Sequence, residues 1–439
     1  MRWAKLYRYK YIAVYLPIWT LAGVVFFALS ALWMPLAPTT VTLSSGPVDG
    51  MYHVHALRYA KLLQERGLDV QVASSVGSGE NLSRLRDADK PAHIAFVQGG
   101  YATQDNAAMG QQRLRLLTVA NIDIEPIWIF SRLRDLDALQ QLQGLRVSIG
   151  QVGSGSRQVA MRLLEQVRLE PKDLVVSETT GLSAVKALQN GSIDASIFVA
   201  APGAPVVRAM LSAPSVYLVQ LKRSAALSER IHFLSPRLVA QGMLGGTPRV
   251  PAQDMVMLST IASVVVREDL HPAIIQLVAW AAQEVHSEGG IFYKPGEFPQ
   301  LKNLDFPSSP VARRTLAAGL PWLEQNTSFV TAQWLRRLMF MGLPLALLAW
   351  LACRLVPAYM RWLLESHVNR WYGELKYIEY DLENQVLSGL DFSRHHIRLR
   401  KIESAVTLFV PPTDYMKRMY ILRQHIHFVR HKLLAKRGR

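Results

Sequence analysis

Two long apolar runs, one near each end of the chain, most constrain how this sequence can fold. Residues 11–37 contain no charged side chain, and residues 338–360 contain a single one, Arg354, near the far end of the run. About 20 apolar residues in a helix cross the hydrocarbon core of a bilayer, and an arginine near the end can reach the interface. We therefore predict two transmembrane helices, over residues 11–37 and 338–360, with the residues between them on one side of the membrane.

Basic residues flank both apolar runs and indicate which side of the membrane each flank occupies. Residues 1–10 contain lysines and arginines but no acid, and residues 361–439 form a longer basic tail. Lysine and arginine are enriched on the cytoplasmic side, so we predict a basic cytoplasmic N-terminus at 1–10 and a basic cytoplasmic tail at 361–439. A cleaved signal peptide is the alternative for the first run. Its length and the lack of a small-x-small cleavage site favour an uncleaved signal anchor.

The formal net charge of +16 is compatible with either nucleic-acid binding or a membrane protein with basic flanks. We favour the membrane protein, and predict no nucleic-acid partner, because the basic residues concentrate next to the apolar runs. Two stretches of the tail, residues 371–386 and 415–439, have the pattern of amphipathic helices. The second is strongly basic and suits anionic lipids or a partner helix. The single cysteine, Cys353, excludes a disulfide framework and a cysteine-based metal cluster.

Between the apolar runs, residues 39–328 alternate between strand and helix patterns. Such alternation predicts an α/β domain with mainly parallel strands joined by right-handed crossovers. The predicted strands are residues 41–43, 70–73, 93–97, 115–120, 146–149, 174–177, 195–199, 216–221 and 255–266. The predicted helices are residues 51–65, 80–87, 156–167, 182–189, 204–211 and 271–285.

One stretch, residues 121–136, breaks this alternation because it is extended and contains a proline, Pro126. We interpret it as a crossover between two lobes, with a second crossover near residues 217–233. Lobe one would then comprise about residues 39–125 and 230–328, and lobe two about residues 126–229. A ligand is expected between the lobes, outside the carboxyl ends of the strands.

Three turns rich in glycine and serine precede predicted helices, at residues 44–50, 76–81 and 152–157. The free N–H groups and the dipole at a helix start suit an anion. Arg157 is the cation placed at such a turn, where it is either a bidentate partner for a carboxylate or a solvated helix residue. Tyr52 is either a ligand contact or a core aromatic, and Gln98 follows a strand at the position where ligand contacts occur.

Catalytic motifs are missing from the sequence. It contains no Walker loop, no HExxH and no GxSxG elbow, and His53, His55 and His93 lack metal-ligand spacing with nearby acids. We predict no enzyme activity, no catalytic residue, no metal site and no cofactor.

Four motifs in fixed order resemble one known family. They are SSGPVDGMYHVHALRYAKLL, SSVGSGENLSRLRDADKPAHIAFVQGGYA, VSIGQVGSGSRQVAMRLLE and LQNGSIDASIFVAAPGAPVVRAML. They are similar to those of the TAXI-type solute receptors of tripartite ATP-independent periplasmic (TRAP) transporters, over roughly residues 40–324. Val48 and Asp49 stand where small residues are usual in that family, His53 replaces a second aromatic, and Ser156 replaces threonine. Typical members are free secreted proteins, whereas this chain has an apolar run at each end.

The resemblance implies a two-lobed type II periplasmic binding fold, here flanked by the N- and C-terminal transmembrane helices. It also implies an anionic solute such as glutamate or 2-oxoglutarate, a TRAP-type permease subunit as partner, and a bacterial inner membrane location with the ligand domain in the periplasm. We therefore predict a membrane-anchored solute receptor, with a sensor that signals through its cytoplasmic tail as the alternative. By motif position, the ligand-binding residues are Ser45, Gly46, Tyr52, Ser78, Asn81, Gln98, Ser154, Ser156 and Arg157.

Overall fold

A computed structural model describes residues 10–87, 89, 91–101, 115–245, 250–384, 388–409 and 415–437. The chain divides into two compact units, residues 37–333 and residues 1–36 with 334–439. The predicted basic N-terminus, apart from its last residue, and the final two residues of the predicted 371–386 and 415–439 helices lie outside the described residues.

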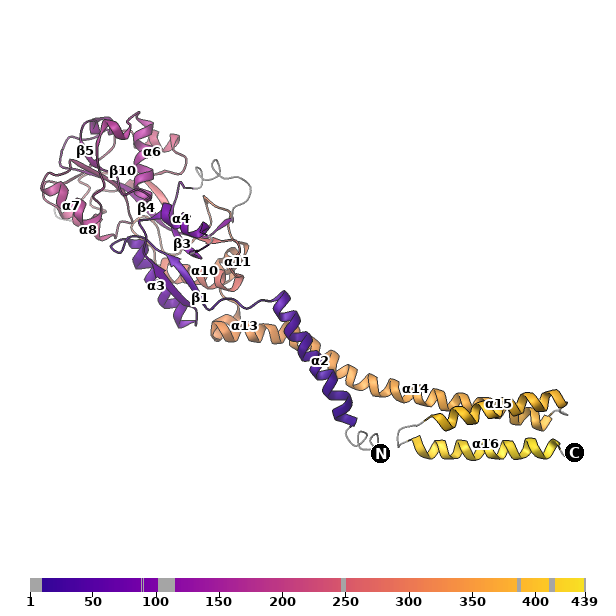
Figure 1. Ribbon diagram of the computed structural model, residues 1–439. Coiled ribbons are helices and arrows are strands. Elements are labelled where there is room, and N and C mark those ends of the chain that lie inside the picture. Colours follow the sequence, from indigo (N-terminus) through magenta and orange to yellow (C-terminus); the bar gives the residue numbers. More distant parts are fainter. Residues whose placement is uncertain are drawn as a thin grey trace. The chain divides into compact units, whose positions relative to one another are not determined.

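Residues 37–333 fold around a ten-stranded sheet, of which Figure 1 labels β1, β3, β4, β5 and β10. Eight strands follow the order β2-β1-β3-β10-β4-β7-β5-β6, while β8 pairs with β4 and β9 pairs with β10. Two long strands, β4 (Leu116–Ser131) and β10 (Met255–Arg267), lie next to one another in the middle of this order. The strands on one side of this pair form lobe one, and those on the other side form lobe two.

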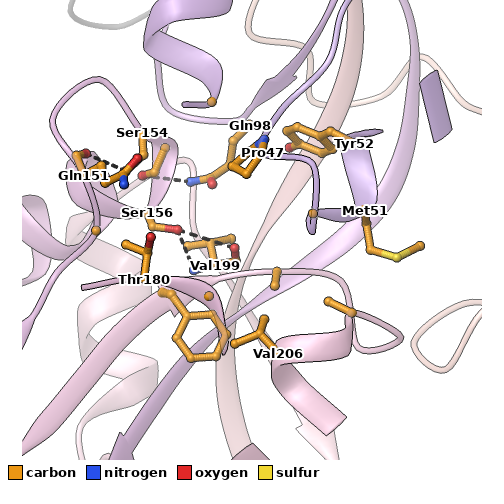
Figure 2. Close-up of a pocket in the computed structure, with 18 of the residues that line it drawn as sticks. Pro47, Met51, Tyr52, Gln98, Gln151, Ser154, Ser156, Thr180, Val199 and Val206 are labelled. Atoms are coloured by element: carbon orange, nitrogen blue, oxygen red, sulfur yellow. Dashed lines mark hydrogen bonds between the residues drawn. The ribbon is translucent and has the colours of Figure 1, made fainter. Parts of the chain in front are cut away.

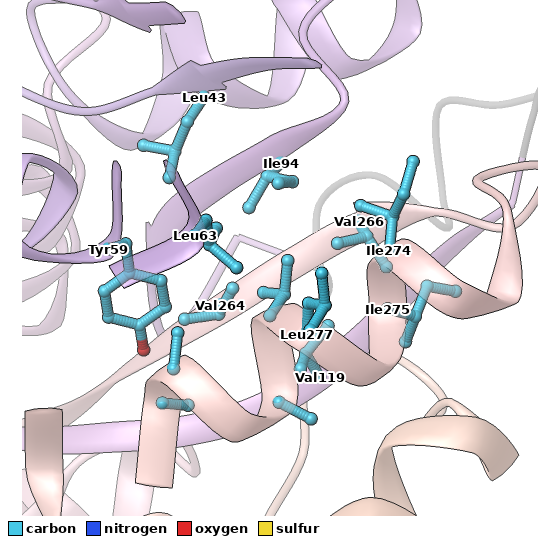
Figure 3. Close-up of a cluster of buried hydrophobic side chains, with 14 of the residues drawn as sticks. Leu43, Tyr59, Leu63, Ile94, Val119, Val264, Val266, Ile274, Ile275 and Leu277 are labelled. Carbon is cyan, nitrogen blue, oxygen red and sulfur yellow. The ribbon is translucent and has the colours of Figure 1, made fainter. Parts of the chain in front are cut away.

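Lobe one contains the parallel strands β1, β2 and β3, with the crossover helices on the sheet. Its core is formed where α3 and α10 pack on the sheet, and Figure 3 shows Tyr59, Leu63 and Leu277 meeting Val264 there. Residues three or four apart on α3 share a face, which explains why Tyr59 and Leu63 are buried together. The lobe comprises β1 (Thr40–Ser44), α3 (Met51–Glu65), β2 (Asp69–Ala73), α4 (Ser78–Arg86), β3 (Ile94–Gln98), α10 (Pro272–His286), α11 (Pro310–Ala318) and α12 (Trp322–Asn326).

Lobe two repeats the plan with the parallel strands β5, β6 and β7. Its two clusters of buried apolar side chains lie between the sheet and the helices that connect its strands. The lobe comprises η1 (Leu139–Leu142), β5 (Arg146–Ser148), α6 (Gly155–Gln166), η2 (Pro171–Asp173), β6 (Val175–Ser177), α7 (Gly181–Gln189), β7 (Ala195–Val199), α8 (Pro205–Ser212), β8 (Tyr217–Leu218), α9 (Ser224–Arg230) and β9 (Ser235–Val239).

Both long strands pass from one lobe into the other. The first part of β4 pairs with β10, and its last five residues pair with β7. Likewise β10 pairs first with β9 and later with β3. The chain therefore has the two-lobed α/β fold of a type II periplasmic binding protein.

The first predicted crossover, residues 121–136, overlaps β4, but the second, near residues 217–233, was wrong. That stretch forms β8 and α9 on lobe two, and the return to lobe one is β10. The physical reason is burial. A crossover strand in the middle of a sheet is covered on both faces and needs a nearly continuous apolar run. Residues 255–266 supply one, whereas residues 217–233 contain several charged side chains.

The second unit is helical. It contains α2 (Lys10–Trp33), the end of α13 (Phe329–Arg337), a π-helical turn (Leu338–Gly342), α14 (Leu343–Asn384), α15 (Gly389–Leu408) and α16 (Met416–Arg437). Two stretches are long and apolar enough to cross a membrane, Val14–Trp33 and a run within Phe329–Asn384, and few of their side chains are buried. The last part of α14 packs with α15 and α16 into a bundle with its own apolar core.

Candidate functional site

A cavity of about 170 Å³ lies between the two lobes at the carboxyl ends of their parallel strands. In Figure 2, Pro47 and Tyr52 from lobe one face Ser156, Thr180 and Val206 from lobe two across this space. A volume of this size holds a small molecule rather than a peptide segment.

Five helices begin at this cavity. Their N-cap residues, Gly50, Gly77, Ser154, Thr180 and Ala204, all line it, and they precede α3, α4, α6, α7 and α8 in that order. Each helix start carries a partial positive charge and N–H groups without a partner inside the helix. Their convergence makes the cavity favourable for negative charge.

The charged side chains of the cavity are acids. Asp49 and Glu125 line it, and none of the described lining residues is a lysine, an arginine or a histidine. Glu125 is only 5% exposed, and its Oε2 accepts a hydrogen bond of 2.8 Å from the Tyr52 hydroxyl. Burial raises the pKa of Glu125 to about 8, helped by nearby Asp123 and opposed by the Tyr52 hydrogen bond. Glu125 is therefore mainly protonated at neutral pH.

Asp123 lies two residues before Glu125 on β4. Burial raises its pKa to about 6, while hydrogen bonds from the Ile124 amide and from Tyr293 act in the opposite direction. The Tyr52 hydroxyl keeps its proton, because burial and the neighbouring Glu125 hold its pKa well above the usual range. At neutral pH Glu125 and Tyr52 are therefore mainly uncharged, whereas Asp123, beside the cavity on the same strand, is mainly ionised.

Five of the nine predicted ligand residues line the cavity: Tyr52, Ser78, Gln98, Ser154 and Ser156. The Ser78 hydroxyl accepts a 2.9 Å bond from the backbone N–H of Gln98, which fixes the turn against β3. The Ser156 hydroxyl accepts a 3.0 Å bond from the backbone N–H of Val199. The Ser154 hydroxyl accepts from the N–H of Arg157 at 3.2 Å and thereby caps α6.

Three of the other predicted residues, Ser45, Gly46 and Asn81, are buried but do not line the cavity. The Asn81 carboxamide has four protein partners. Its Oδ1 accepts from the hydroxyls of Ser44 and Ser75, each at 2.6 Å, and its Nδ2 donates to the carbonyls of Ser45 and Phe96 at 2.7 and 2.8 Å. Asn81 therefore holds the glycine turns in place from behind.

Arg157 also lies outside the cavity. Its guanidinium donates to the Gly150 carbonyl at 3.2 Å, pairs with Glu178 at 3.5 Å, and lines a separate groove beside α6. Successive residues of a helix differ by about 100° in direction, so the start of α6 cannot point both Ser156 and Arg157 at the same space. Ser156 faces the cavity, and Arg157 faces away from it.

Hydrogen bonds join the lobes beside the cavity. The Gly79 N–H donates to the Gly153 carbonyl at 3.0 Å, the Tyr101 hydroxyl donates to the Ser154 carbonyl at 3.0 Å, and Gln98 Nε2 donates to the Gly155 carbonyl at 3.3 Å. A Cβ on Gly79 would lie 2.6 Å from the Gly153 oxygen, so only glycine permits this approach. The lobes are therefore closed on one another.

Sequence reasoning missed Glu125 and the apolar wall formed by Phe198. Glu125 did leave a signal. It and Asp123 are the charged residues within the otherwise uncharged strand β4, and buried acids are rare without a specific reason. No sequence signal marks Phe198 as a cavity residue, because aromatic residues are common on buried strands. Within the described residues, no group of three or more histidine, cysteine or acidic side chains is arranged to hold a metal ion.

Comparison with known proteins places the chain in a family. The model of the NMT1-like family matches residues 43–281, which is more than half of the chain and extends from β1 into α10. The protein is a member of the NMT1-like family. No curated protein sequence matches it.

Three solved structures illustrate the similarity of this NMT1-like protein to others. A Bordetella bronchiseptica RB50 protein is 16% identical, with 69% of this chain and 98% of that one covered and a TM-score of 0.41. The periplasmic aliphatic sulphonate binding protein SsuA from Escherichia coli is 16% identical, with coverage of 57% and 70% and a TM-score of 0.36. The alkanesulfonate-binding SsuA from Xanthomonas axonopodis pv. citri, bound to MOPS, is 15% identical, with coverage of 71% and 95% and a TM-score of 0.35.

Proposed function

We propose that this NMT1-like protein is a membrane-anchored extracytoplasmic receptor that binds a small solute between its lobes for uptake. The observation that carries the proposal is the convergence of five helix N-caps on a cavity between closed lobes. The lining supports a binding role in this proposal rather than an enzymatic one. Its serines have no histidine beside them to act as a general base within the described cavity.

The solute in this proposal is a small anion, such as glutamate or 2-oxoglutarate. Backbone N–H groups and helix dipoles at the five helix starts would hold its negative charge, in place of the guanidinium of Arg157. The sequence motifs shared with TAXI-type receptors support a TRAP-type permease subunit as the partner that takes up the solute.

The apolar stretches support an anchored receptor. In the proposed topology, residues 11–37 and 338–360 cross a bacterial inner membrane, the solute-binding domain of residues 39–328 is periplasmic, and both termini are cytoplasmic. The basic surface of the tail would then contact anionic lipids of the inner leaflet.

A second candidate function, ligand sensing, is favoured by one observation. The tail forms a helical bundle whose core buries side chains such as Leu382, Leu399 and Leu422, far more structure than an anchor requires. In this alternative the same solute domain would signal to a cytoplasmic partner through the bundle.

A thermal-shift screen on the full-length protein in nanodiscs tests the proposal. The panel contains 2-oxoglutarate, glutamate, other dicarboxylates, alkanesulfonates, phosphate and putrescine. A solute at about 100 times its Kd stabilises the native state by about 2.7 kcal/mol, which raises the melting temperature measurably. Recovery of the solute unchanged after incubation separates binding from turnover. A panel without any stabilising anion would overturn the proposal.

Uptake by vesicles that contain a candidate permease, with and without the receptor, tests the transport role. Uptake that depends on the receptor supports transport. A solute that binds without supporting uptake, but alters what the bundle binds, supports sensing instead.

A further inference from the structure

Glu125 occupies an unusual position in the cavity. It lies near the middle of the first crossover strand β4, and it lines the cavity although the residue is only 5% exposed. Among the described residues, the hydrogen bond from Tyr52 to Oε2 is the one that this carboxyl group makes. A buried carboxyl group with one partner retains hydrogen-bonding capacity toward whatever fills the cavity.

Within the described residues, no lysine, arginine or histidine lines the cavity beside Glu125. Tyr52 faces it from α3, Asp123 lies on the same strand, and Thr260 of β10 is directly opposite in the sheet register. Asp49 is the other acid that lines the cavity. A carboxylate in such a place has no counter-ion and gains a proton instead, which agrees with its pKa of about 8.

The Tyr52 hydroxyl cannot satisfy a second acceptor. Its single proton is used in the bond to Oε2, and its ring is stacked against Phe96 with 5.5 Å between the centroids, which holds the hydroxyl oxygen beside this carboxyl group. Because Oε2 accepts from Tyr52, a protonated Glu125 can carry its own proton on Oε1, which makes no hydrogen bond to the described residues.

We propose that Glu125 is a specificity-determining residue, which donates a hydrogen bond to an anionic solute as an uncharged carboxylic acid and so couples solute binding to a proton. This inference rests on the function proposed above and names how the site recognises its solute. In this interaction the Glu125 O–H donates a hydrogen bond to an oxygen of the anion, and no covalent bond forms or breaks. An ionised Glu125 would instead repel the anion across a cavity of low dielectric.

Calorimetric titration of the full-length protein in nanodiscs with 2-oxoglutarate, from pH 6 to pH 9.5, tests the inference. The affinity is expected to be constant below about pH 7 and to fall toward tenfold per pH unit above pH 8, because each binding event then requires one proton. Glu125→Gln keeps a donor and an acceptor without a titrating proton. It should bind within a few-fold of the wild-type affinity at pH 7 and lose the decline at high pH.

Two further variants distinguish the contribution of Glu125 to the pH dependence of binding from that of other acids. Glu178→Gln is the matched control, since Glu178 is 63% exposed and pairs with Arg157 outside the cavity, and it should keep the full pH dependence. Asp49→Asn tests the other acid of the cavity. Loss of the pH dependence in Asp49→Asn but not in Glu125→Gln would overturn the inference.

The remaining outcomes are distinct for the two proposals. Binding of 2-oxoglutarate with the same affinity at pH 6 and pH 9 overturns the role of Glu125 but leaves the receptor function intact. Preference for putrescine, with binding abolished by Glu125→Gln, shows an ionised Glu125 and also overturns it. Failure of every compound in the panel to bind overturns the receptor function itself. An infrared carboxyl band at pH 7 in the solute-free protein, absent from Glu125→Gln, reports the proton independently of any solute.

Discussion

The backbone N–H of Gly79 in lobe one donates a 3.0 Å hydrogen bond to the carbonyl oxygen of Gly153 in lobe two. The two glycines lie at the starts of α4 and α6, so the bond joins two of the helix starts that surround the cavity. Closure of the lobes thus depends on a backbone approach that a side chain at residue 79 would prevent.

Gly79→Ala is expected to weaken solute binding at least tenfold. The added Cβ would lie 2.6 Å from the Gly153 oxygen, so the lobes must separate to accommodate it. The fold of lobe one should tolerate the change, because alanine is better than glycine within a helix by about 0.5–1 kcal/mol. Calorimetric titration and small-angle scattering of the variant measure affinity and opening together.

Gly203→Ala is the matched control, since a Cβ there meets nothing within 4 Å. It should leave the solute affinity of the protein, and its dimensions measured by small-angle scattering, unchanged. An unaltered affinity in Gly79→Ala would mean that the solute binds to open lobes.

Asn81→Ala is expected to destabilise lobe one by about 2–4 kcal/mol, because it leaves two buried carbonyls and two hydroxyls without their partner. Urea denaturation followed by the intrinsic fluorescence of the protein measures the loss. Asn190→Ala, at an exposed position where the side chain bonds only Ser192, should cost less than 1 kcal/mol. Lost solute binding at unchanged stability would instead place Asn81 at the solute, as its sequence motif predicts.

The contrast between Asn81 and Ser156 shows what the sequence can and cannot predict. Both residues follow glycine turns. Such turns can be predicted from the sequence, because glycine and serine before an amphipathic run mark a helix start. Which residue of the turn faces the cavity depends on how the helix is rotated on its sheet. Tertiary packing decides that rotation, and it turned Ser156 inward and Arg157 outward.

Local patterns mark Glu125 as an unusual acid in an apolar strand, but they do not place it at the cavity. It lines the cavity because β4 passes between lobes and pairs with both β10 and β7, strands that are distant in sequence. The alternation of strands and helices, in contrast, is a local property, and it correctly predicted the α/β fold. The second crossover is formed by the nearly continuous apolar run of residues 255–266 and not by residues 217–233, which contain several charged side chains.

Acid is expected to destabilise lobe one through His55 and His286. Their rings contact one another at 4.7 Å between centroids, and burial lowers the pKa of His55 to about 4 and that of His286 to about 2. The unfolded chain, with a histidine pKa near 6.5, binds protons that the native state excludes. Stability is therefore complete above about pH 6.5 and is lost as the pH falls toward 4.

His286→Phe removes one of these two groups and should reduce the acid sensitivity. The urea midpoint of the wild type is expected to fall between pH 7 and pH 5, and that of the variant to fall less. His53→Phe, at a partly exposed position of the same helix as His55, serves as the comparison. Identical pH profiles for the wild type and His286→Phe would show that other groups cause the acid sensitivity.

The C-terminal bundle provides the last prediction, since Leu422 is fully buried in its core. Leu422→Ala is expected to destabilise the bundle by about 2–5 kcal/mol, because it removes buried methyl groups and leaves a cavity. Trypsin should then cut within residues 388–437 faster than in the wild type. Leu434→Ala, 46% exposed on the same helix, is the control and should be cut at the wild-type rate.

Solute affinity should not change in either variant, because the bundle and the solute cavity belong to different compact units. If Leu422→Ala supports uptake normally, the bundle is dispensable for transport. If it abolishes partner binding while solute binding persists, the sensing role is favoured.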